Sequence, residues 1–417
     1  MNRNFWFVLT LIMLILMSFS TLRFNLGFEV RLNQIFILFV FTLIFLYDLK
    51  NKTLNIKLLT FLISFGLLLS LISLNSPYQK LGQFKFIIKY IFIFPAVFYT
   101  GSRLINLIEP KYLIKAVEIA VLIYCIDAVI LYYFPIPFLI HDRGALTGFQ
   151  GTFWETVWLA KAVMLLFLAS VSLRFDFNVF PKRKYFLIIF YGFLLIIEII
   201  TRSKAIWLAL GLISLYIIVS KFMFNFLSYK RLGHNLYIRE KFISQLQNLN
   251  ISFIIPLILI ISLILYIANN YILEKPIVTI EMIQHKIEEE RGKAFRIALE
   301  LLKNSNWLGG YGFGFVESFF STFHDEVIGL GAGVSMLFNS YLDIWLSASI
   351  IGLIYALALL ILSFNQKYLF TTIIPIYLFI TGNISPYIGS EYYWLFLGFS
   401  FGLARLYKKR IIKYEKK

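Results

Sequence analysis

The sequence predicts an all-α protein, a polytopic transmembrane bundle of about twelve helices. Hydrophobic residues make up 60% of the 417 residues and charged residues only 15%, whereas soluble domains carry roughly 45–50% and about 25%. The apolar residues fall in blocks of about 16–22, which is long enough to cross a hydrocarbon core of roughly 30 Å. The basic residues behind the net charge of +17 gather between these blocks, so membrane topology explains them better than a nucleic-acid partner does.

The predicted spans follow one another along most of the chain. Two of them contain a proline, Pro95 and Pro375, which membrane helices tolerate where neighbours satisfy the freed carbonyl group. The expected spans are residues 5–22, 33–47, 56–74, 86–100, 114–134, 157–173, 185–200, 204–223, 251–268, 339–363, 369–384 and 391–407.

The distribution of positive residues predicts that the N- and C-termini are cytoplasmic. The loop at 174–184 carries four positive residues and the tail from Arg405 onward carries seven, whereas the loop at 135–156 on the opposite side carries only Arg143. Lys80, Lys85 and Lys89 conflict with this pattern, because the predicted topology places them on the outer side.

This topology divides the chain into spans one to nine (1–268), a large outer loop between spans nine and ten (269–338), and spans ten to twelve with a basic cytoplasmic tail (339–417). In the outer loop, apolar residues at helical spacing predict an amphipathic helix between Pro276 and Asn306, in two pieces that meet at Gly292. The glycine-rich run GGYGFGF (309–315) is expected to end it. Function is expected in this loop, because loops held by a rigid scaffold commonly carry it.

Several familiar sites are missing from the sequence. It contains no P-loop, no HExxH, no CxxC and no pair of aspartates separated by one residue. With four histidines and the single cysteine Cys125, a Cys/His zinc site is not expected. The sequence therefore disfavours an ATP-driven pump and a zinc protease, and it predicts neither a metal nor another cofactor.

Two basic clusters are expected at the outer face. The turn TRSK (201–204) would hold Arg202 and Lys204 at the membrane surface, where an arginine suits bidentate capture of phosphate oxygens; an interfacial anchor would have the same composition. On the predicted outer helix, Lys293 and Arg296 share a face near Arg291. This second cluster is either another anion clamp or a solvated face paired with nearby glutamates.

Polar residues also occur within or beside the predicted spans. Asp127, Lys161 and Glu198 lie in apolar blocks, and Asp343 lies at an interface. Such charges are costly in a membrane and often functional, although a buried pair that fixes helix packing is the favoured explanation for Asp127 and Lys161. At the start of the tenth span, Asn339 or Ser340 is expected to cap the helix.

At four places the chain resembles the O-antigen polymerase and O-antigen ligase superfamily. In order, these are RGALTGFQGTFWETVWLA (143–160), TRSKAIWLAL (201–210), an outer loop with a basic helix and the GGYGFGF turn, and NSYLDIWLSASIIGL (339–353). The resemblance covers about residues 140–360 and implies a membrane-embedded glycosyltransferase of GT-C type. Such enzymes act at the outer face of the bacterial inner membrane on glycans linked to undecaprenyl diphosphate, and they need neither nucleotide sugar nor ATP.

The resemblance also implies roles for individual residues. Arg202 matches the turn arginine of the family, and Arg291 or Arg296, with Arg296 favoured, matches its outer-loop arginine. These residues would bind the diphosphate, aided by Lys204 or Arg143. The proposed candidates for the base that deprotonates the acceptor hydroxyl are His324, which is preferred, then Glu155, and Asp343, with Asp325 and Glu326 as neighbours of the first. The residues expected to contact sugars are Asn339, Tyr341 and Tyr311.

One departure separates two activities within the superfamily. Ligases carry a histidine directly before the asparagine of the last motif, but this chain has Phe338 there, and phenylalanine cannot accept a proton. The sequence therefore favours the polymerase, which transfers a growing glycan onto the non-reducing-end sugar of another lipid-linked repeat unit. A chain-length regulator protein would be a partner, besides the bilayer and the lipid-linked oligosaccharide.

Two alternatives remain open. The nearest is O-antigen ligase, which delivers the polymer to lipid A–core. The other is a transporter of lipid-linked oligosaccharides, which is less favoured because the sequence shows no convincing internal repeat.

Overall fold

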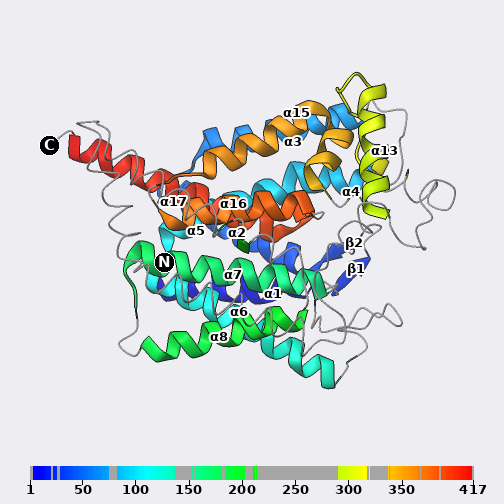
Figure 1. Cartoon of the computed structure of the whole chain (residues 1–417). Coiled ribbons are helices and arrows are strands. Elements are labelled where there is room, and N and C mark those ends of the chain that lie inside the picture. The colour runs from blue at the N-terminus through cyan, green and yellow to red at the C-terminus, as the bar shows by residue number, and fades with distance from the viewer. Residues whose placement is uncertain are drawn as a thin grey trace, which may run out of the picture.

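The computed structural model is a bundle of helices that run alongside one another (Figure 1). One short antiparallel hairpin interrupts the helical pattern, in which β1 (Arg23–Asn25) pairs with β2 (Glu29–Arg31). The predicted all-α class is therefore confirmed apart from this hairpin. The structure describes residues 3–19, 22–25, 29–74, 82–134, 136, 153, 156–180, 184–201, 210–211, 213, 290–316, 319, 337, 339–366, 368–384 and 387–415.

The described residues contain five helices long and apolar enough to cross a membrane. They are α2 (Leu32–Lys50), α3 (Ile56–Leu74), a continuous run from Phe84 to Leu107, α7 (Thr156–Phe177) and α15 (Ser340–Ser363). Two shorter apolar helices, α1 (Arg3–Leu16) and α16 (Leu369–Ile384), lie beside them. With α6 (Pro110–Tyr133), α8 (Lys184–Thr201) and α17 (Glu391–Glu415), these helices form a helical membrane protein.

Ten of the expected spans coincide with these helices, and the differences are local. The first helix ends at Leu16 rather than residue 22, because the chain turns there into the hairpin. The fourth span begins earlier and has three parts, α4 (Gly82–Ile88), the π-helical turn η1 (Lys89–Ile93) and α5 (Phe94–Leu107). The expected spans 204–223 and 251–268 lie almost wholly outside the described residues, so the count of twelve stays a prediction.

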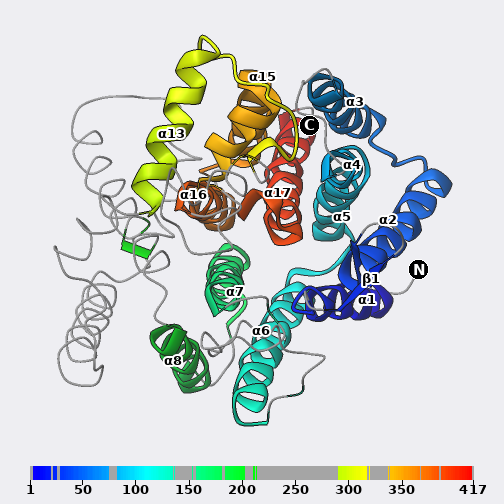
Figure 2. The ribbon, with the colours of Figure 1, turned by 90° about the vertical axis from the view of Figure 1, so that its right-hand side faces the viewer.

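The bundle has two ends, which we name by what lies there. The loop end holds the β1–β2 hairpin and the helix α13 (Glu290–Asn304), and the tail end holds the end of α17 (Figure 1). Figure 2 views the loop end along the bundle and shows α17 between α5, α15 and α16. The two connections described in full, α2–α3 and α5–α6, both lie at the tail end, and the predicted topology likewise places them on one side. A cytoplasmic tail end stays a prediction.

Glycines bring α5 and α17 into direct backbone contact. A Cβ on Gly398 would lie 2.3 Å from the carbonyl oxygen of Phe98, and one on Gly402 would lie 2.3 Å from that of Ser102. The two glycines are four residues apart and so share one helix face. This spacing of small residues lets membrane helices approach closely where no water drives them together.

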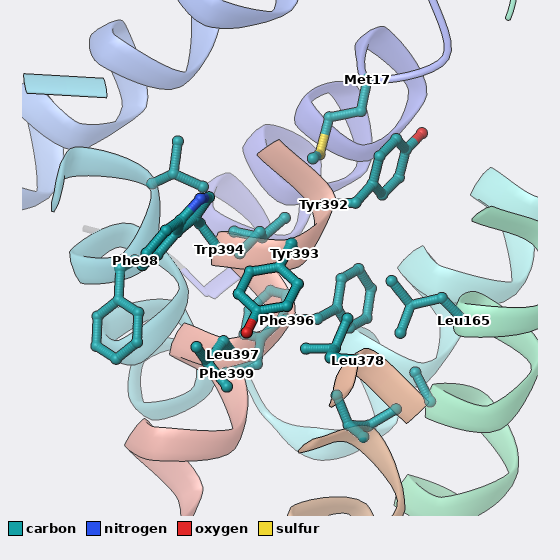
Figure 3. Close-up of a cluster of buried hydrophobic side chains, with 14 of the residues drawn as sticks. Met17, Phe98, Leu165, Leu378, Tyr392, Tyr393, Trp394, Phe396, Leu397 and Phe399 are labelled. Carbon is teal, nitrogen blue, oxygen red and sulfur yellow. The ribbon is translucent and has the colours of Figure 1, made fainter. Parts of the chain in front are cut away.

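The core around the first half of α17 is aromatic. The ring of Trp394 stacks on that of Phe94 with 4.9 Å between centroids, and its indole N–H donates a hydrogen bond to the Ile388 carbonyl at 2.8 Å. Figure 3 shows this cluster, in which Phe98 and Leu378 approach α17 from different helices. This stacking holds α5 against the first half of α17 near the loop end.

Two bidentate ion pairs tie the helices together at the tail end. The guanidinium of Arg103 donates to both carboxylate oxygens of Asp48, at 2.6 and 2.5 Å, and the hydroxyl of Tyr99 donates to the same carboxylate. Arg174 binds Glu118 in the same way, with two bonds of 2.7 Å. Arg174, one of the four positive residues of the loop at 174–184, therefore also joins two helices.

Candidate functional site

Helix α15 is broken in its first half. Ala348 and Ser349 leave the helical conformation, and Ser349 has φ 65° and ψ 178°. A break of this kind releases backbone groups that need other partners, because a bilayer core offers no water. One such group is the N–H of Ile350, which donates to the carbonyl oxygen of Leu308 at 2.9 Å.

The glycine-rich segment 309–315 satisfies the carbonyl groups on the other side of the break. The N–H groups of Gly310 and Tyr311 both donate to the Leu346 carbonyl at 2.8 Å, and that of Gly312 donates to the Ser347 carbonyl at 2.9 Å. The segment thus lies against the break in place of the missing helical turn. The sequence predicts only that this run ends a helix, so its docking into α15 is a new finding.

The backbone of this segment explains its composition. All four of its glycines, at 309, 310, 312 and 314, have φ between 67° and 96°, a region that other residues avoid. Glycine therefore occupies the positions of this segment where φ is positive, and the aromatic residues Tyr311, Phe313 and Phe315 occupy the others.

Helix α13 lies across the loop end and anchors this segment (Figure 1). The hydroxyl of Tyr311 donates to the carbonyl of Leu301 at 2.7 Å, and its ring stacks on Phe315 with 4.6 Å between centroids. The buried face of α13 packs against Leu342 and Leu346 of α15 through Ala294, Ala298 and Leu302.

The predicted amphipathic helix is therefore confirmed over Glu290–Asn304. The description of this helix begins only two residues before Gly292, and the residues before Glu290 lie outside the described ranges. The expected junction at Gly292 therefore stays a prediction.

The same segment reaches into the bundle through Phe313. Its N–H donates to the hydroxyl of Ser73 on α3 at 2.7 Å, and its ring stacks on Tyr90 with 4.7 Å between centroids. Tyr90 lies in the π-helical turn η1, a local geometry often found at functional sites. The glycine-rich segment, the broken helix and η1 consequently meet at one place.

Asp343 lies at this meeting point, in the first turn of α15. Its carboxylate is half-buried, accepts a hydrogen bond from the Ser347 hydroxyl at 3.1 Å, and interacts electrostatically with Tyr90. The positive end of the helix dipole favours an ionised carboxylate at this position. Asp343 is thus a partly accessible anion beside a tyrosine and a break in the backbone.

Glu391, a carboxylate at the start of α17, has different surroundings. It is 2% exposed, accepts a hydrogen bond from Gln34 at 2.6 Å, and lies 3.9 Å from the guanidinium of Arg31. Lys89 adds a further favourable electrostatic interaction. These partners hold α17 to α2 and η1, and they make Glu391 a structural residue.

The other polar residues predicted at the start of α15 have packing roles. Asn339 is the N-cap, as expected, because its side-chain oxygen accepts from the N–H groups of Tyr341 and Leu342 at 3.0 Å each. Tyr341 is only 5% exposed, and its hydroxyl lies 3.3 Å from that of Tyr393. Both residues therefore support the position of Asp343.

The basic residues predicted to bind diphosphate are less fully described. Arg296 is exposed on α13, while Ala294 and Ala298 of the same helix are buried against α15, so Arg296 lies on the opposite face. No ion pair joins it to any residue in the described ranges. The site residues that fall outside these ranges are Arg143, Glu155, Arg202, Lys204 and His324, together with the side chain of Arg291 and with Phe338.

Lys161 is the most deeply buried of the cations predicted within spans. It is 2% exposed, and its ammonium lies 4.7 Å above the ring centroid of Trp158. This cation–π contact within α7 stabilises the charge inside the bundle. The choice between a packing role and a substrate role for Lys161 stays as the sequence left it.

Comparison with known proteins does not identify the chain. No protein-family model matches it, and no curated protein gives a significant match. Within the described ranges, no group of three or more His, Cys, Asp or Glu residues is placed to hold a metal ion. The function must therefore be argued from the residues and their geometry.

Proposed function

We propose that the chain is a membrane-embedded glycosyltransferase of O-antigen polymerase type. It would transfer a growing glycan from undecaprenyl diphosphate to the non-reducing-end sugar of another lipid-linked repeat unit, at the periplasmic face of the inner membrane. The observation that supports this most is the docking of the glycine-rich segment into the break of α15. It joins the last two motifs of the resemblance around the carboxylate of Asp343.

In the proposed reaction, the acceptor hydroxyl loses its proton, its oxygen bonds to the anomeric carbon of the donor, and the bond from that carbon to the diphosphate breaks. Of the candidate bases His324, Glu155 and Asp343, Asp343 is the one whose surroundings are described: its carboxylate is half-buried and accepts a hydrogen bond from Ser347. A positioned base of this kind contributes about 10²–10⁴ in rate.

The leaving diphosphate carries negative charge that the protein must neutralise. We assign this task to Arg202 and Arg296, with Lys204, Arg291 and Arg143 as further candidates, because arginine offers a planar pair of donors to phosphate oxygens. Removal of one such contact typically costs about 10²–10³ in rate. Arg202→Lys should also perform poorly, because lysine retains the charge but not the paired donors.

The test is a gel of surface glycolipid from a deletion strain that carries the wild-type chain, Arg202→Ala or Arg296→Ala. Lys303→Ala is the matched control, because Lys303 is exposed on the same helix as Arg296. We expect a ladder from the wild type and the control, and core plus one repeat unit from the empty strain and both arginine variants, at equal protein abundance in the membrane. Normal ladders from both arginine variants would remove the assignment of the diphosphate site.

The same gel distinguishes the alternatives. Loss of an O-antigen ligase would leave bare core with polymer on the carrier lipid. The transporter is favoured by one observation, the break in α15, because transporters bind substrates at discontinuous helices. Loss of a transporter would leave bare core with single repeat units on the carrier lipid. Either pattern in the deletion strain would overturn the polymerase proposal.

A further inference from the structure

A cavity of about 310 Å³ opens at the tail end, away from the site described above. Its walls come from α5, from α17 and from the connection between α2 and α3, and they include Asn55, Asn106, Phe401 and Gly402. Ser102 and Gly402, whose backbones are in close contact, also line it. Its volume lies at the lower end of the range usual for small-ligand sites, about 300–1,000 Å³.

The cavity is positively charged. Arg103 and Arg405 line it, and none of its lining residues is acidic. The carboxylate nearest to Arg103 belongs to Asp48, which is completely buried and also accepts hydrogen bonds from Tyr99 and Thr53. An anion is therefore the ligand class that fits this lining.

Hydrogen-bond donors in the cavity remain available. A guanidinium has five N–H donors, and Arg103 uses Nε and Nη2 on Asp48 and Thr53, which leaves Nη1 without a partner among the described residues. The guanidinium of Arg405 is exposed and lies 4.4 Å above the ring centroid of Phe401, with no described carboxylate paired to it. The Asn55 oxygen caps α3 through Leu58, so its amide N–H₂ is also available.

We propose that this cavity binds the phosphate of an anionic phospholipid headgroup. The guanidinium groups of Arg103 and Arg405 would hold the phosphate oxygens, with the amide of Asn55 as a further donor. Phe401 and Leu54 give the cavity an apolar wall beside the polar groups, as a molecule with both a phosphate and hydrocarbon chains requires. Basic pockets between membrane helices are a known way to bind such lipids.

The surrounding sequence supports a lipid rather than a soluble phosphate. Lys50, Lys52 and Lys57 flank the cavity on the α2–α3 connection, and the tail beyond Arg405 contributes six further positive residues. Each positive residue near a membrane surface attracts anionic lipid by about 1 kcal/mol. The cavity also lies where apolar helices end, which is the level of lipid headgroups. The inference does not depend on the polymerase proposal.

The experiment measures thermal unfolding of the purified protein in detergent micelles while lipid is added. We expect phosphatidylglycerol to raise the melting temperature of the wild type, and phosphatidylcholine to leave it unchanged. Arg405→Ala should need about tenfold more phosphatidylglycerol for the same rise, because a hydrogen bond to a charged group is lost. Lys57→Ala is the matched control, since Lys57 is exposed at the same end but does not line the cavity.

Two results would overturn the inference. One is an equal response of Arg405→Ala and Lys57→Ala, which would show that general surface charge attracts the lipid. The other is an equal rise with inorganic phosphate at matched ionic strength, which would identify a soluble anion as the ligand. Arg405 is exposed, so its replacement should leave the lipid-free melting temperature unchanged; Arg405→Gln provides a second variant if Arg405→Ala is less stable.

Discussion

Gly309 packs directly against the backbone of Trp345, so that a Cβ added to Gly309 would lie 2.1 Å from the Trp345 carbonyl oxygen. The indole N–H of Trp345 in turn donates to the carbonyl of Trp307 at 2.9 Å. The entry of the glycine-rich segment into the break of α15 is therefore fixed by backbone contact on one side and by a hydrogen bond on the other.

Gly309→Ala is expected to displace the glycine-rich segment. The new Cβ would collide with backbone, and alanine would have to adopt a φ of 67°, which costs about 1–2 kcal/mol by itself. The melting temperature and ladder formation should both fall. Gly389→Ala is the control, because a Cβ there meets nothing within 4 Å. Equal behaviour of the two variants would contradict the described docking.

Gly398→Ala is expected to separate α5 from α17. The carbonyl of Phe98 cannot move away without moving its helix, so a cost of about 1–3 kcal/mol is expected from overpacking. Thermal unfolding of purified protein measures it. Gly192→Ala in α8 has open space around the new Cβ and should be neutral or stabilising, since alanine is the better helix former. A Gly398→Ala protein as stable as this control would refute the close contact.

Glu118 and Arg174 are expected to depend on each other. Their two bonds of 2.7 Å join α6 to α7, and Ser170 donates to the same carboxylate. Glu118→Gln and Arg174→Met should each lower stability, and the double variant should be more stable than the sum of the single losses predicts, with a coupling energy of about 0.5–3 kcal/mol. A double-mutant cycle from thermal unfolding measures this coupling. If the loss of stability in the double variant equals the sum of the two single losses, the interaction between Glu118 and Arg174 contributes little to stability.

Local sequence patterns predicted the features that depend on residues close together in the sequence. Apolar blocks located the described spans, helical spacing located α13, and residue type identified the Asn339 cap. The break at Ser349 could not be seen in the same way, because the apolar pattern of α15 continues through it. Its signal lies in another segment, the alternating glycines at 309–314 that pair with the freed carbonyl groups.

Contacts between distant residues explain one conflict in the sequence. Lys89 opposes the positive-inside pattern, and the structure places it at the loop end near Glu391, where their opposite charges attract. Glu391 also bonds to Gln34, which is 357 positions away. Nothing in the sequence next to Lys89 or Glu391 indicates that the two residues lie close together. Sequence periodicity alone therefore could not predict their interaction.

Asp343 and Glu391 are expected to respond differently to loss of their charge. Asp343 is half-buried and accepts a hydrogen bond from Ser347, whereas Glu391 is buried and compensates Arg31 and Lys89. Asp343→Asn should therefore keep a melting temperature close to that of the wild type and lower glycan transfer by about 10²–10⁴, the contribution of a general base.

Glu391→Gln should instead lower the melting temperature, because it removes the buried carboxylate that faces Arg31 and Lys89. Since Arg31 is partly exposed, the loss should lie below the roughly 3–5 kcal/mol of a fully buried pair. The fraction that folds should still transfer glycan, since Glu391 does not belong to the proposed chemistry. Thermal unfolding together with the ladder per unit of folded protein separates the two effects. If Asp343→Asn loses stability but retains its activity per folded molecule, Asp343 is a structural residue, and the base must be sought at His324 or Glu155.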